Sequence, residues 1–280
     1  MKKFLLIVII LLFPGLGSGA SEPLRIISLS PAVTEILFKM GMQEKIAAVT
    51  NVCDYPAAAK QKPNVGSMVH PSIEEILLLK PDLVIMSNDG NTFWAKQRLD
   101  QLNIKTYVFR ARRIQDLPGA IRSLGMALGS QKDAEMLASF IEQRITLLMQ
   151  TLPEAKIRKK ALFTIWPDPL TVVGSGTGID DAMNMLGLQN IAADLHMPYP
   201  RYSLEEIIAS QPEIIFIGKG NIAAEDAYRN LLKRLYMLDA VKNGRVCYIS
   251  DKVYRIGPRI VDGIEEMAEC VRKYGAKQKK

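Results

Sequence analysis

Side chains that bind metals or perform catalysis are scarce in this 280-residue chain, which has three cysteines and only two histidines. The cysteine spacings fit no zinc motif, and a zinc site would need more ligands than two histidines and a scattered carboxylate. No serine–histidine–aspartate or cysteine–histidine arrangement has motif support, and no paired catalytic carboxylates stand out. The sequence therefore predicts neither an enzyme nor a metalloprotein with its own metal or cofactor.

A concentrated basic surface is also missing. The net charge is +7, but the charges are interspersed, apart from a lysine-rich end at residues 277–280. No basic stripe with interleaved aromatic residues occurs, which is the pattern expected for nucleic-acid binding. We therefore expect no nucleic-acid partner.

Long apolar runs are absent except at the start of the chain. Lys2 and Lys3 precede an apolar run over residues 4–13, which is shorter than the roughly 20 residues of a membrane span. Small residues follow at positions 18–20, and no cysteine stands there for lipid attachment. Residues 1–20 are therefore predicted to be a secretory signal peptide, and the mature chain to be a soluble periplasmic protein.

The remaining sequence alternates strand and helix patterns, which is typical of parallel α/β units. The predicted strands are 25–30, 45–50, 83–86, 105–109, 160–165, 214–217 and 246–249, with helices around 31–40, 72–80, 92–102, 179–185, 204–210, 230–235 and 263–274. We expect an α/β fold with an N-terminal lobe over residues 21–128 and a C-terminal lobe over residues 154–280.

A single long helix is predicted between the lobes, within residues 129–153. Apolar residues recur there at steps of three and four from Met136 to Met149, and Pro153 ends the pattern. About 20 residues at 1.5 Å each give a helix roughly 30 Å long. Since no glycine or proline interrupts it, the helix is expected to be a stiff joint rather than a flexible linker.

One segment occurs twice, as SIEEILLLKPDLVIMS and, 131 residues later, as SLEEIIASQPEIIFIG. In each copy a serine, Ser72 or Ser203, stands where a helix begins, with a glutamate, Glu75 or Glu206, three residues later. This spacing predicts a capping box, in which the hydroxyl and the carboxylate each accept a hydrogen bond from a free backbone N–H.

The other glutamate of each copy, Glu74 or Glu205, is not needed for the capping box. One interpretation is stabilisation by the helix dipole, worth about 0.3–1 kcal/mol. The alternative is that two equivalent lobes present two exposed carboxylates to a partner with two basic sockets.

Several segments resemble the periplasmic substrate-binding proteins of ABC importers for cobalamin, haem and ferric siderophores. They read RIISLSPAVTEILFKMG, CDYP, PNVG, SIEEILLLKPDLVI and ISDKVYRIGPR, and the resemblance covers essentially the whole mature chain. Within this family the chain is most similar to the cobalamin-binding proteins, because Tyr199 lies between two prolines and Ser203-Leu204-Glu205 follows.

The resemblance implies two lobes joined by one backbone helix, with the ligand in the cleft between them. It also implies that Glu74 and Glu205 dock on arginines of a dimeric permease, and that the binding protein acts as a monomer. The bound ligand is expected to be cobalamin or a related corrinoid, with haem or a ferric siderophore as the alternative. An enzyme with a two-lobe α/β cleft is the alternative from another class.

The cleft is expected to combine flat apolar surfaces with a few polar anchors. The candidate ligand-binding residues are Cys53, Met68, Trp166, Tyr199, Asp251, Tyr254 and Arg255. Of these, Asp251 and Arg255 are the anchors, and Cys53 is either a small buried residue or a thiol near the ligand.

Other positions leave the ligand open. Cobalamin-binding relatives have aromatic residues where this chain has Val52, Met68 and Ser87. His70 and His196 are either ligands for a haem or metal, one from each lobe, or polar loop residues. Separately, Cys247 and Cys270 could pair within the C-terminal lobe, which would leave Cys53 unpaired.

Overall fold

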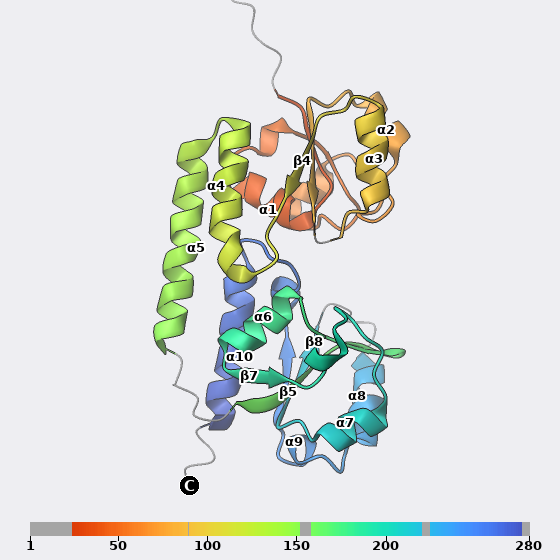
Figure 1. Ribbon diagram of the computed structural model, residues 1–280, viewed down its shortest axis with the longest axis vertical. Helices are drawn as coiled ribbons and strands as arrows, with labels where there is room; N and C mark the ends of the chain where they lie inside the picture. Colours follow the sequence, from red (N-terminus) through yellow and green to blue (C-terminus); the bar gives the residue numbers. More distant parts are fainter. Residues whose placement is uncertain (1–23, 89, 152–157, 220–224, 276–280) are drawn as a thin grey trace, which may run out of the picture.

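The computed structural model describes residues 24–88, 90–151, 158–219 and 225–275, so the predicted signal peptide lies outside the described residues. Figure 1 shows two α/β lobes, one above the other, with long helices along one side. In the described part of the chain, no helix combines the length and the apolar character needed to cross a membrane.

The N-terminal lobe contains a four-stranded sheet in the order β2-β1-β3-β4, and all of its pairs are parallel. Its strands are β1 (Ile26–Ser28), β2 (Ile46–Val49), β3 (Leu83–Ser87) and β4 (Thr106–Phe109). Its helices are α1 (Pro31–Lys39), α2 (Ile73–Leu78) and α3 (Phe93–Gln101), with short 3₁₀ segments η1 (Gln43–Lys45), η2 (Ala57–Gln61) and η3 (Ile114–Asp116). The apolar runs predicted as strands are therefore the buried strands of this sheet.

The C-terminal lobe contains a second sheet in the order β6-β5-β8-β9, with β7 paired to β5. Its strands are β5 (Lys159–Pro167), β6 (Leu170–Val172), β7 (Leu188–Asn190), β8 (Ile214–Gly218) and β9 (Val246–Ile249). Its helices are α6 (Gly178–Met185), α7 (Leu204–Ser210), α8 (Glu225–Arg234), α9 (Asp239–Lys242) and α10 (Ile260–Gly275), with 3₁₀ segments η4 (Ala193–Leu195) and η6 (Asp251–Tyr254). Among the described strands of this lobe, β6 alone runs antiparallel to its neighbour, forming a hairpin with β5.

The two predicted lobes with largely parallel sheets and the long helix α5 (Gln131–Thr151) are confirmed. The sequence patterns missed α4 (Leu117–Leu128), which lies beside α5 and runs antiparallel to it (Figure 1). The sequence of α4 contains three residues that disfavour helices, Pro118, Gly119 and Gly125, so it was not predicted as a helix. Gly125 has a packing role, because a Cβ there would come within 2.1 Å of the Cβ of Ala134 on α5.

Ion pairs fasten the helices of the joint to one another. Arg122 on α4 contacts Glu135 and Glu142 on α5 at 2.8 and 2.6 Å. Further along α5, Arg144 contacts Asp262 at 2.6 Å near the start of α10, which belongs to the C-terminal lobe. The long helix is therefore held both to its neighbour α4 and to the second lobe.

The largest hydrophobic core passes through both lobes without interruption. It includes Phe109 of the first sheet, Ile121 of α4, Ile141 of α5, Phe163 of the second sheet and Met267 of α10. Two smaller clusters cover other sheet surfaces, one in each lobe. The lobes therefore share their main core through the joint helices.

The cysteines pair as one of the sequence interpretations allowed. Cys247 on β9 and Cys270 on α10 form a disulfide. Cys53 is free and buried. The disulfide fastens the last helix to the edge strand of the second sheet.

Candidate functional site

Polar contacts between the lobes show which edges of the two sheets face each other. In a parallel sheet the carboxyl ends of the strands share one edge, which is where α/β proteins bind ligands. Asp54 follows β2 and lies 3.5 Å from Arg255, which follows β9. The carboxyl edges of the two sheets therefore face each other, and this region, called the lobe junction below, is the candidate ligand-binding site.

The strongest contact across the lobe junction is a buried ion pair. Arg259 donates to both carboxylate oxygens of Glu35 on α1, at 3.0 and 2.7 Å, and the two side chains are only 13% and 5% exposed. The guanidinium also lies 4.1 Å from the ring centre of Tyr55, and Asp251 is 3.7 Å away. Such a bidentate ion pair fixes both the distance and the relative orientation of its two side chains, so it constrains how the two lobes pack against each other.

Burial and pairing act on the two partners of this contact in different ways. The hydrogen bonds to Glu35 raise the pKa of Arg259 above its usual value. Burial raises the pKa of Glu35, because removing a carboxylate from water costs more than Arg259 returns. The carboxylate of Glu35 therefore depends on its arginine.

A second contact connects the lobes through the backbone. The N–H of Ile114, in η3, donates to the Oδ2 atom of Asp181 on α6 at 2.6 Å. Burial at this contact raises the pKa of Asp181. The chain of the first lobe therefore reaches the second lobe before it turns back into α4.

The predicted aromatic residues of the C-terminal lobe have different environments. Trp166, at the end of β5, and Tyr199 are exposed. Tyr254 is half-buried and packs edge-on against Phe163, with 6.4 Å between the ring centres. Trp166 and Tyr199 therefore have aromatic surface exposed to solvent, whereas part of the ring of Tyr254 is packed in the core.

The predicted residues of the N-terminal lobe are less accessible. Cys53 is buried, and its sulfur lies 3.2 Å from the hydroxyl oxygens of Thr34 and Thr50. Met68 is half-buried, and its carbonyl oxygen accepts a hydrogen bond of 2.7 Å from Asn91. The burial of Cys53 agrees with the interpretation of a small buried residue, and a thiol contact with a ligand stays a prediction.

An exposed aromatic pair in the first lobe was not among the predicted site residues. Phe93 and Trp94 are the first two residues of α3 and are 79% and 54% exposed. Thr92 caps this helix and donates to the carbonyl oxygen of Val69 at 3.3 Å, which fixes the helix start beside the loop that carries Met68. Because α3 follows β3, the aromatic pair lies at the carboxyl edge of the sheet. Two aromatic residues directly after a helix-capping threonine are the sequence signal that could have identified this pair.

Both histidines are exposed loop residues. His196 adopts a left-handed backbone conformation with φ of 52° at the end of η4. Within the described ranges, no group of three or more histidine, cysteine, aspartate or glutamate residues could hold a metal ion. A ligand role for His70 and His196 stays a prediction.

The two copies of the doubled segment begin their helices differently. Ser203 and Glu206 form the complete capping box, with hydrogen bonds of 3.1 and 2.7 Å. Ser72 accepts the equivalent bond from Glu75 at 3.2 Å, but its own N–H donates to Val65 at 2.8 Å. The capping box predicted at Ser72 is therefore only half formed, because the backbone of a neighbouring loop has replaced the carboxylate.

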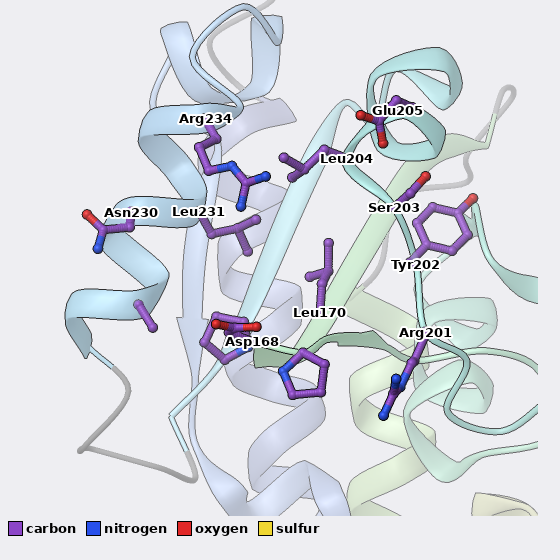
Figure 2. Close-up of a pocket in the computed structure, with 13 residues that line it drawn as sticks. Asp168, Leu170, Arg201, Tyr202, Ser203, Leu204, Glu205, Asn230, Leu231 and Arg234 are labelled. Atoms are coloured by element: carbon purple, nitrogen blue, oxygen red, sulfur yellow. The ribbon is translucent and has the colours of Figure 1, made fainter.

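The two candidate docking carboxylates, Glu74 and Glu205, are both exposed. Glu205 lies on the rim of a pocket of about 640 Å³, which Figure 2 shows between α7, α8 and the β5–β6 hairpin. The other lining residues are Pro167, Asp168, Pro169, Leu170, Arg201, Tyr202, Ser203, Leu204, Ala227, Asn230, Leu231 and Arg234. All residues that line the pocket belong to the second lobe. The pocket does not include the residues of the two ion pairs that cross the lobe junction.

A profile of the family described as periplasmic binding protein matches residues 26–253. The chain belongs to this family. The match spans β1 to η6 and so covers both lobes and the joint helices. The resemblance seen in the sequence motifs is thereby confirmed.

Individual relatives agree with the family. The chain is 29% identical over 250 residues to a vitamin B12-binding protein of Vibrio cholerae, over 89% of each chain. It is also 29% identical to an uncharacterised ABC transporter substrate-binding lipoprotein of Bacillus subtilis, over 89% of this chain and 80% of that one. As a family member, the chain is a substrate-binding protein of the ABC-importer type, and an extracytoplasmic location follows.

Solved structures include relatives with different ligands. The periplasmic vitamin B12-binding protein of Vibrio cholerae superposes with a TM-score of 0.80 at 28% identity, covering 89% of this chain and 96% of that one. The periplasmic haem-binding protein of Roseiflexus sp. RS-1 superposes with a TM-score of 0.79 at 26% identity, covering 88% and 97%. The same fold therefore occurs in relatives that are named for different ligands.

Proposed function

We propose that this protein captures cobalamin or a related corrinoid outside the cytoplasm and delivers it to the permease of an ABC importer. The observation that carries the proposal is exposed aromatic surface on both lobes, which we assign to the lobe junction. Trp166 and Tyr199 supply it from the second lobe, and Phe93 and Trp94 from the first.

A flat macrocycle is the kind of ligand that such a site suits. Broad apolar faces bind aromatic rings, while a few polar groups fix orientation. The first lobe lacks aromatic residues at Val52, Met68 and Ser87, and we assign their role to Phe93 and Trp94. A corrin or porphyrin ring held between the lobes would contact both aromatic groups.

Haem is the second candidate. A haem-binding protein superposes nearly as well as the cobalamin-binding one. Haem iron also accepts histidine or tyrosine as an axial ligand, and His70, His196 and Tyr199 are exposed. Ligand titration has to decide between the two rings.

Recognition and delivery, rather than catalysis, make up this activity. The exposed carboxylates of Glu74 and Glu205, one on each lobe, are proposed to bind basic residues of the permease dimer. The protein would act as a monomer in the periplasm after removal of residues 1–20.

Calorimetric titration of the mature chain with cyanocobalamin tests the ligand. We expect one-to-one binding with a dissociation constant of about a micromolar or below, near −8 kcal/mol. Trp94→Ala should weaken binding by about tenfold, since it removes an aromatic face. Tyr236→Ala, which removes an exposed ring on the loop after α8, is the matched control and should leave the affinity unchanged.

Two outcomes would contradict the ligand assignment. Absence of heat with cyanocobalamin, together with binding of haemin, would replace the corrinoid by haem. Equal affinity of wild type and Trp94→Ala would remove the aromatic pair of α3 from the site.

Charge reversal tests the delivery step. The double variant Glu74→Lys/Glu205→Lys should bind ligand with unchanged affinity but abolish transport in reconstituted importer vesicles. Glu44→Lys, another exposed glutamate, is the control and should transport normally. Loss of ligand affinity in the double variant would count against a docking role for the two carboxylates.

A further inference from the structure

The pocket beside Glu205 has an apolar floor. Leu170, Leu204 and Leu231 come from β6, α7 and α8 and converge on its centre (Figure 2). A volume of about 640 Å³ has room for bulky side chains. A surface pocket with apolar side chains at its centre and charged residues at its rim has the composition of an interaction site.

The rim of the pocket carries charges of both signs. Asp168 and Glu205 bring carboxylates, and Arg201 and Arg234 bring guanidinium groups. Figure 2 shows Arg234 reaching over the leucines toward Leu204, with Glu205 on the opposite side. Within the described ranges, the ion pairs of the second lobe involve other residues, so these four charges are not neutralised by a neighbour at 4 Å or less.

The first lobe also sets a carboxylate beside an apolar side chain. Leu78 lies four residues after Glu74, hence on the same face of α2, and is 75% exposed. Each lobe therefore combines one exposed carboxylate with apolar surface. The first lobe presents an exposed leucine, and the second a pocket.

These features favour a protein segment over a small free ligand as the occupant. Arg201, Asn230 and Arg234 are exposed, so the rim is open to a partner surface. An apolar floor inside a rim with charges of both signs is complementary to an occupant that carries both signs next to an apolar group. A loop of a partner protein can combine these groups.

We propose that the pocket beside Glu205 is a socket for a loop of the importer permease. The loop inserts an apolar side chain onto Leu170, Leu204 and Leu231. A basic residue beside it pairs with Glu205, and an acidic residue pairs with Arg201 or Arg234. The identification of the partner as the permease rests on the proposed function. With this socket, the two lobes would contact the two halves of the permease through different surfaces.

Substitutions on one face of α8 test the socket. Asn230→Trp fills the pocket from its rim, and Arg234→Glu reverses one rim charge. Lys233→Trp and Arg229→Glu make the same changes at exposed positions of α8 that do not line the pocket. Binding to the permease–ATPase complex in lipid nanodiscs is measured by interferometry, cyanocobalamin affinity by calorimetry, and folding by thermal unfolding.

We expect Asn230→Trp and Arg234→Glu to weaken binding to the importer by at least about tenfold, as for central interface residues. The two control variants should change it by less than about twofold, and all four should retain wild-type cyanocobalamin affinity. Wild-type importer binding by both pocket variants would overturn the proposal. An equal loss in the controls would also overturn it, because the effect would then belong to the whole face of α8.

The test of the socket can be distinguished from the test of the ligand. If cyanocobalamin does not bind the wild type but the pocket variants alone lose importer binding, the socket stands and the ligand is different. The pocket could instead bind a small compound that co-purifies with the wild type. If Asn230→Trp loses that compound but still binds the importer, the socket is overturned in favour of a ligand site.

Discussion

Removing Arg259 should destabilise the protein in a way that depends strongly on pH. The variant Arg259→Met keeps much of the side-chain volume but leaves the buried carboxylate of Glu35 without its partner. A buried charge that loses its partner becomes neutral instead of remaining ionised. Asp251, which lies close to Arg259, adds a repulsion that also favours the neutral form of Glu35.

The size of the effect follows from the cost of protonation. For a carboxyl with a usual pKa of 4.5, protonation at pH 7 costs about 3.4 kcal/mol, at about 1.36 kcal/mol per pH unit. The lost stacking on Tyr55 adds about 0.5–1 kcal/mol. Because the pKa of Glu35 is already raised in the native protein, this sum is an upper limit, and the variant should lose up to about 4 kcal/mol at pH 7, against a usual range of about 3–5 kcal/mol for a broken buried pair.

The sign of the pH dependence follows from burial, which raises the pKa of Glu35 in the native protein and should raise it further once the lowering effect of Arg259 is removed. A raised folded-state pKa means that the fold favours the protonated form, so the loss is small at low pH and grows as the pH rises above 4.5. At pH 5 protonation costs only about 0.7 kcal/mol, so the variant should then lie within about 1.5 kcal/mol of the wild type.

Urea unfolding followed by tryptophan fluorescence, at pH 5 and pH 7, measures both free energies of unfolding. Arg122→Met is the control, because its partners Glu135 and Glu142 have lowered pKa values and stay ionised at both pH values, so its deficit should be the same at pH 5 and pH 7. The apolar pair Glu35→Leu/Arg259→Met should recover most of the loss. A deficit for Arg259→Met that is equal at both pH values, or a double variant as unstable as the single one, would refute the reasoning.

Three further predictions concern the joint, the disulfide and a helix cap. Arg122 lowers the pKa of Glu135 to about 2, so its support should be complete above pH 4.5 and fade as the pH falls toward 2; melting temperatures of wild type and Arg122→Ala should converge over that range. Replacing Cys247 and Cys270 by serine should lower the free energy of unfolding by about 3 kcal/mol for a loop of this length, measured in urea, and no change would contradict a native disulfide. Glu206→Ala should cost about 0.5–1 kcal/mol in the same assay, and a neutral result would mean that the capping box adds nothing.

Elements with a single strong periodicity could be predicted from the sequence. Helix α5 has an uninterrupted apolar repeat, and its observed bounds, Gln131 and Thr151, lie inside the predicted range of residues 129–153. The strand β9 was predicted with its observed ends, Val246 and Ile249, because a short apolar run between turn residues has few alternatives. Helix α4 was missed, since the packing partner that explains Gly125 lies on another helix.

The contacts between the lobes were beyond prediction from local patterns. Glu35 and Arg259 are separated by 224 residues, and each looks like an ordinary exposed charge in its own segment. The difference between Glu75 and Glu206 has the same origin, because the loop residue that replaces the carboxylate of Glu75 is recognisable only in three dimensions. Phe93 and Trp94 became noticeable only when their exposure was known.

The shared hydrophobic core has a consequence for how the molecule folds. Because one apolar cluster extends from Phe109 through α4 and α5 to Phe163, neither lobe encloses a complete interior by itself. Severing the chain between the halves would expose apolar faces of α4, α5 and α10 to water, so each fragment should be incompletely folded alone. When mixed, the fragments should recover native structure together, as two parts of one cooperative unit.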